Sequence, residues 1–293
     1  MAAHTVRYTS PAKAYHLTPP ISPFTGKIDL WTVSESIQEH PREDLHKEGV
    51  YEYHVVIEKE VATEQDLSRA CTEACTIAKE LETVWIYPAG RPFNFTRLTV
   101  QFPEEPPGWS GNLKEVKQAI RRESQANLFL DVRHNKRNWE TPPFLPLETA
   151  LQAREAYLTA DPIIRDMIDL HAGAFMNFGQ PRFVLLSKAL EIAGASYPAS
   201  PRTTVRQARN AGLQTLVTDA GLAGNLTQTV EWLFDISNER RDIRHGWDKK
   251  ARDLHPLLTT QEAEEFVRNA DLVVRVFICT ELSLPVVSYQ GKL

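Results

Sequence analysis

Residues 141–146 read TPPFLP, and the sequence has a different character on each side of this stretch. Three prolines in six positions interrupt any helix or central strand, so the segment predicts a boundary between elements. A chain of 293 residues is long enough for two domains of ordinary size. We therefore expect one domain over residues 1–145 and a second over residues 146–293.

After this boundary, almost every segment has apolar residues at helical spacing. The clearest is RFVLLSKALEIA, Arg182–Ala193, in which Phe183, Leu186, Leu190 and Ala193 share one face. Further helices are expected over Glu148–Thr159, Pro162–Leu170, Arg202–Val217, from Asn225 or Thr227 to Ser237, and from Thr259 or Thr260 to Leu282. Five or six helices in about 140 residues predict an all-α bundle.

Before the boundary, the chain has the pattern of a mixed α/β domain. The stretch Tyr51–Lys59, YEYHVVIEK, is rich in residues that favour strands. Further strands are expected at Val84–Tyr87, Phe93–Phe102 and Asn127–Val132, and helices from Thr63 to Leu81 and over Leu113–Arg122. The whole chain is therefore expected to be of the α+β class.

The composition is typical of a globular protein, with 42% hydrophobic and 24% charged residues. No apolar run approaches the roughly 20 residues that cross a bilayer, and residues 1–15 lack the apolar core of a signal peptide. We expect a cytoplasmic protein without a membrane partner.

Three cysteines give no metal-binding pattern. Cys71 and Cys75 are four positions apart on a predicted helix, and Cys279 is distant in sequence. Without a second pair of Cys or His residues at metal spacing, the pattern favours buried thiols over a zinc site. No metal and no cofactor is expected.

Charge is distributed unevenly, although the net charge is only −5. Residues 29–82 hold 14 acidic and 5 basic residues, whereas residues 114–137 hold 7 basic and 3 acidic ones. Residues 240–252 are also basic, with 6 basic and 2 acidic residues. A polyanion is attracted to the last two segments and repelled by the first, although a solvated surface is the commoner explanation for any single cluster.

One segment of the second domain has the residue types of a catalytic motif: Asn238-Glu239-Arg240-Arg241-Asp242-Ile243-Arg244-His245-Gly246-Trp247. It resembles the signature of the HEPN superfamily, in which an arginine is followed four to six residues later by a histidine, and a final amphipathic helix follows the motif. Arg240 and His245 match these positions. Arg241 stands where Asn, Asp or His is more usual. The resemblance covers about residues 162–285, and residues 1–145 resemble no family that we recognise.

The resemblance implies a metal-independent endoribonuclease. The ribose 2′-OH attacks the adjacent phosphate, which leaves a 2′,3′-cyclic phosphate and a free 5′-OH. In that reaction His245 is the acid or base, and Arg240 stabilises the negative charge of the phosphorane-like transition state, with Arg241, Asp242 and Arg244 in support. Prokaryotic proteins of this kind resemble toxins or antiviral-defence effectors.

The spacing of the motif makes a dimer necessary for this chemistry. On an ideal helix, Arg240 and His245 are about 140° apart, so one chain does not bring them together unless the helix ends or distorts near Gly246. The family solves this by pairing two domains around a shared cleft. A homodimer is therefore expected.

Spacing alone is weak evidence, since Arg165 and His171, six positions apart and with Asp166 after the arginine, also fall within the allowed range of four to six. We prefer Arg240 and His245 because a polar connection and a capped final helix follow them.

Other basic residues are candidates for RNA contacts. Arg202, Arg206 and Arg209 share a predicted helix face, and Lys249 and Lys250 extend the positive charge of the motif. Trp247 is a candidate for base stacking, although packing is the commoner role of such a residue.

An alternative reading is a non-catalytic dimerisation or interaction module that binds a protein or nucleic-acid partner. Arg240 then pairs with Asp242 or Glu239, and His245 caps a helix. In either reading, residues 1–145 are a candidate sensor, regulator or platform for a regulatory protein or nucleic acid.

Overall fold

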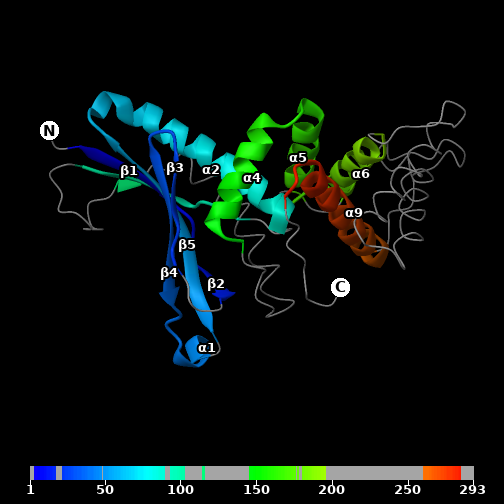
Figure 1. Cartoon of the computed structure of the whole chain (residues 1–293), viewed down its shortest axis with the longest axis horizontal. Helices are drawn as coiled ribbons and strands as arrows, with labels where there is room; N and C mark the ends of the chain where they lie inside the picture. Colours follow the sequence, from blue (N-terminus) through cyan, green and yellow to red (C-terminus); the bar gives the residue numbers. More distant parts are fainter. Residues whose placement is uncertain are drawn as a thin grey trace, which may run out of the picture. The chain divides into compact units, whose positions relative to one another are not determined.

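The computed structural model describes residues 3–17, 22–47, 49–89, 93–102, 114–115, 145–175, 177, 180–195 and 260–284. These residues form two compact units, one up to Ala156 and one from Tyr157 to Leu284. The first unit combines an antiparallel sheet with helices, and the described residues of the second are mainly helical (Figure 1). The expected α+β class is confirmed.

The sheet of the first unit is antiparallel at every described pairing. Its strands are β1 His4–Thr9, β2 Lys13–His16, β3 Thr25–Ile28, β4 Trp31–Glu39, β5 Val50–Val61, β6 Arg97–Gln101 and β7 Lys114–Glu115. They are ordered β3-β4-β5-β1-β6-β7, and β2 pairs with the beginning of β5, whose second half pairs with β1. The expected strand at Tyr51–Lys59 is confirmed as β5, and part of the one at Phe93–Phe102 as β6.

Alternation along β5 assigns one face of the sheet to the core. Tyr53, Val55 and Ile57 are buried, whereas His54 and Glu58 between and beyond them are half-exposed. Successive side chains of a strand point to opposite faces, so the sheet has an apolar face and a polar face. On the polar face Arg7 of β1 forms an ion pair with Glu58.

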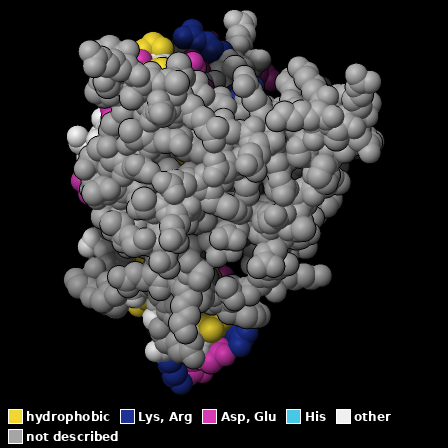
Figure 2. Space-filling view, turned by 90° about the vertical axis from the view of Figure 1, so that its right-hand side faces the viewer, with side chains coloured by type: hydrophobic (Ala, Val, Ile, Leu, Met, Phe, Trp, Pro, Cys, Tyr) yellow, Lys and Arg dark blue, Asp and Glu magenta, His cyan; other side chains and the backbone are white. Residues whose placement is uncertain are grey.

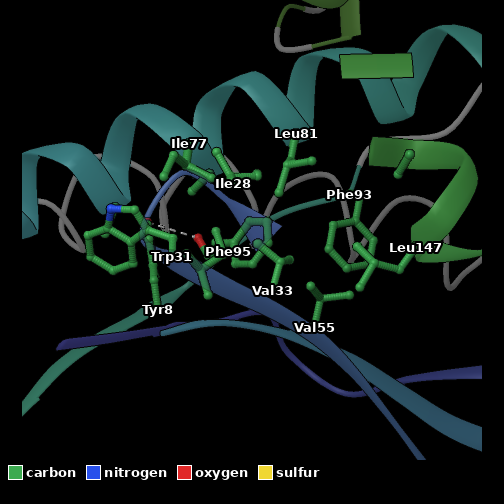
Figure 3. Packing of buried hydrophobic residues seen from close by; sticks show 14 of the residues in the cluster. Tyr8, Ile28, Trp31, Val33, Val55, Ile77, Leu81, Phe93, Phe95 and Leu147 are labelled. Atoms are coloured by element: carbon green, nitrogen blue, oxygen red, sulfur yellow. Dashed lines mark hydrogen bonds between the residues drawn. The ribbon is translucent and has the colours of Figure 1, made fainter. Parts of the chain in front are cut away.

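The core lies between this apolar face and the long helix α2, Leu67–Ala89 (Figure 3). Aromatic side chains fill much of it: Trp85 stacks on Phe93 with ring centroids 4.1 Å apart, and the Tyr8 hydroxyl donates a hydrogen bond of 3.2 Å to the Phe95 carbonyl. The helix expected from Thr63 is present, preceded by a short 3-10 turn at Glu64–Asp66.

The prediction of a strand at Val84–Tyr87 is wrong, because these residues form the last turns of α2. All four side chains are buried, so this part of the helix is apolar on every side. A continuous apolar run of this kind looks the same in the sequence as a buried strand. The structure at Lys114 also differs from the prediction. Lys114 and Glu115 form β7 and pair with Thr99 and Val100, where a helix over Leu113–Arg122 was predicted.

The first unit also includes most of α4, Leu147–Thr159, which was expected to begin the second domain. Leu145, Leu147 and Ala150 belong to the core of the sheet. The hydroxyl of Tyr87 in α2 donates a 2.9 Å hydrogen bond to the Ala153 carbonyl, and Arg154 forms an ion pair of 2.7 Å with Glu80. Residues that follow the proline-rich stretch therefore complete the N-terminal core.

A short helix, α1 Glu43–Lys47, joins β4 to β5 and buries no side chain. Lys47 pairs with Glu43 at 2.6 Å, and Arg42 pairs with Asp44 at 2.7 Å. Acidic and basic side chains accordingly meet at the lower end of Figure 2, where α1 lies in Figure 1.

Three helices make up most of the described part of the second unit: α5 Pro162–Phe175, α6 Gln180–Ala195 and α9 Thr260–Glu281, and each packs on the other two. They confirm the helices expected at Pro162–Leu170, Arg182–Ala193 and from Thr260. Asp161 caps α5, since its carboxylate accepts a 2.9 Å hydrogen bond from the Ile163 amide. The helices expected over 202–217 and 225–237 lie outside the described residues, so the complete bundle stays a prediction.

Candidate functional site

The candidate catalytic and RNA-binding residues lie outside the described residues. This holds for the motif residues Arg240, Arg241, Asp242, Arg244 and His245, and for Arg202, Arg206, Arg209, Trp247, Lys249 and Lys250. The structure places helices on both sides of this stretch, α6 before it and α9 after it.

Within the described helices of the second unit, ionisable side chains from three helices form one group. We call His171, Arg182 and Asp271, with the ring of Phe175, the His171 cluster. The periodicity of α5 explains why a histidine is there: Ile164, Ile168, His171 and Phe175 occupy one buried face of that helix. α6 contributes Arg182 from its first turn, and α9 contributes Asp271.

His171 is entirely buried and bonds to Asp271. Its Nε2 lies 2.6 Å from Asp271 Oδ1, and the two side chains are 0% and 16% exposed. Nδ1 has no hydrogen-bond partner among the described residues. The hydrogen bonding of His171 to the described residues therefore runs through Nε2 to α9.

Arg182 places its guanidinium over the ring of Phe175. Its Cζ lies 5.0 Å from the centroid of the Phe175 ring, within the range of cation–π contacts. Burial lowers the pKa of Arg182, and the charge of Asp271 acts in the opposite direction. The ring of His171 meets Phe175 edge to face at 5.2 Å. The cluster thus joins α5, α6 and α9 through one carboxylate, one guanidinium and two rings.

The next turns of α9 are buried as well. Arg275 is 4% exposed, and Cys279 is fully buried. Burial raises the pKa of the Cys279 thiol to about 12, although Arg275 acts to lower it. Since the thiolate is the nucleophile and metal ligand, this cysteine is chemically inert near neutral pH. The prediction of a buried thiol is confirmed for Cys279, while Cys71 and Cys75 are half-buried on α2.

The second Arg–His pair of the sequence, Arg165 and His171, lies on α5. His171 is closed to solvent, and the Arg165 Nε is buried without a hydrogen-bond partner among the described residues. A general acid or base must come within hydrogen-bond reach of the proton that it transfers. An RNA phosphate does not reach His171 in this arrangement, so its role is to hold α5 to α9.

A buried carboxylate also lies in the first unit. Glu35 on β4 accepts hydrogen bonds from the Phe24 amide at 2.8 Å, the Tyr53 hydroxyl at 3.0 Å and the Leu147 amide at 3.3 Å. Burial raises the pKa of Tyr53 well above its ordinary value, and the Glu35 charge adds to this effect. Since these donors belong to the chain itself, Glu35 joins β4, β5 and the start of α4.

Sequence reasoning missed the His171 cluster and Glu35. Asp271 is 100 positions from its histidine, and one sequence contains no signal that pairs them. Among the described residues, no three metal-ligating side chains gather, and no helix is both long and apolar enough to cross a membrane.

No family model, curated protein or solved structure matches this chain. Function is therefore inferred from its own residues.

Proposed function

We propose that this chain is a metal-independent endoribonuclease of the HEPN type that acts as a homodimer, with Arg240 and His245 at its active site. The observation that carries the proposal is the motif itself, Arg240 to Gly246 in a basic segment. Two features of the fold are consistent with it. The described residues on both sides of the motif are helical, and α9 begins at Thr260, where the final helix was expected.

The other Arg–His pair of the sequence is less suited to catalysis, which also supports Arg240 and His245. The rival pair contains His171, whose ring is buried and bonded to Asp271. A histidine in that position holds helices together and does not exchange protons with a substrate.

The proposed reaction needs no metal. His245 removes the proton from the ribose 2′-OH as its oxygen attacks phosphorus, and the bond from phosphorus to the 5′ oxygen breaks. The leaving 5′ oxygen takes up a proton from water or from the protonated His245, and the products are a 2′,3′-cyclic phosphate and a 5′-OH. Histidine suits proton exchange near neutral pH, and the arginine fork suits the negative charge that develops on the phosphoryl oxygens.

RNA binding is proposed for Arg202, Arg206, Arg209, Lys249 and Lys250 through phosphates, and for Trp247 through base stacking. Arg241, Asp242 and Arg244 support the motif. The sheet-containing unit has the role of a sensor or regulator in this proposal, and the whole chain that of a toxin or antiviral-defence effector.

The test is cleavage of mixed RNAs by the purified full chain in EDTA, with light scattering to establish the oligomeric state. Wild-type protein should release ends with a 2′,3′-cyclic phosphate. His245→Ala and Arg240→Ala should each lower the rate by about 10²-fold or more, as expected for loss of an acid–base group or a charge-stabilising group.

His54→Ala is the matched control, because His54 is a half-exposed histidine on the polar face of the sheet. It should cleave at the wild-type rate. Cleavage that is equally fast without His245 would show that the proposed active site is wrong. If a dimeric wild-type protein leaves all RNAs intact, the chain is instead a non-catalytic interaction module or an effector that awaits its activator.

A further inference from the structure

We draw no further inference here: the strongest candidate, the buried His171 cluster between α5, α6 and α9, carries nothing beyond its role in packing, because Asp271 already offsets the charge of Arg182 and His171 is closed off from solvent.

Discussion

His171 on α5 and Asp271 on α9 form a hydrogen bond of 2.6 Å, although they are 100 positions apart in the sequence. Both helices present mainly apolar residues to the interior of the second unit, so this polar contact fixes their register where apolar packing alone tolerates sliding. Arg182 links a third helix, α6, to this group through its contact with the Phe175 ring of α5.

Asp271→Asn should destabilise the second unit by about 1–3 kcal/mol, because the buried hydrogen bond of His171 loses its charged partner and Arg182 loses the negative charge that opposes the effect of its burial. The change is measured as the free energy of unfolding in urea, together with hydrogen exchange of the α5 and α9 amides. Asp166→Asn makes the same substitution on the exposed side of α5 and should cost less than about 0.5 kcal/mol. Equal effects of the two changes would show that Asp271 does not organise these helices.

Alkaline pH should weaken the first unit through Tyr53. Its folded pKa is raised above the ordinary value of 10.0, mainly by burial. The neutral phenol is therefore favoured by folding, and this contribution is complete below pH 10 and is lost as the pH rises further. Unfolding free energies measured from pH 9 upward should fall more steeply for the wild type than for Tyr53→Phe.

Tyr51→Phe is the control for that experiment, since Tyr51 is half-exposed on the same strand. Its pH profile should follow that of the wild type. A Tyr53→Phe profile that also follows the wild type would contradict the assignment of alkaline sensitivity to the buried phenol.

Gly26→Val should destabilise the first unit by about 1–3 kcal/mol through overpacking. A Cβ at Gly26 would lie 2.5 Å from Leu151 Cδ1 and 3.0 Å from the Phe24 ring, so α4 lies directly against β3. Leu151→Ala removes the nearer obstacle.

The double variant Gly26→Val/Leu151→Ala should therefore be more stable than the sum of the two single changes predicts, in a double-mutant cycle of unfolding free energies. Strict additivity would mean that β3 and α4 are not in contact, and would move the end of the first unit back toward the proline-rich stretch.

The thiol of Cys279 should resist alkylation in the folded protein. With a pKa of about 12, about one molecule in 10⁴ carries the thiolate at pH 8, and the side chain is buried as well. Mass spectrometry after treatment with iodoacetamide should find Cys279 unmodified in buffer and modified in denaturing urea. Rapid modification in buffer would show that α9 is not packed as described.

The helices were largely predictable, because their apolar residues recur at helical spacing over many turns. This holds for α4, α5, α6 and α9. The strand β4 was not predicted, and Glu35 explains why. The inward positions of β4 are Trp31, Val33 and Glu35, so the alternation of apolar and polar residues is interrupted by a carboxylate. Only the donors from Phe24, Tyr53 and Leu147 make that buried position acceptable.

The boundary between the two domains was likewise predicted only in part from the sequence. The prolines of residues 141–146 mark a change from mixed to helical sequence, but composition does not reveal which surface a helix covers. Leu147 and Ala150 are apolar residues that either domain could bury, and the structure packs them on the sheet.

For the candidate site, the sequence by itself determined the motif of Arg240 and His245 and the chemistry that these residue types allow. Tertiary structure decided the role of the other histidine of this pattern, because His171 meets its carboxylate only after α5 and α9 have packed together. Local periodicity is encoded by residues a few positions apart, whereas burial and ion pairing depend on residues that the folded chain alone makes neighbours.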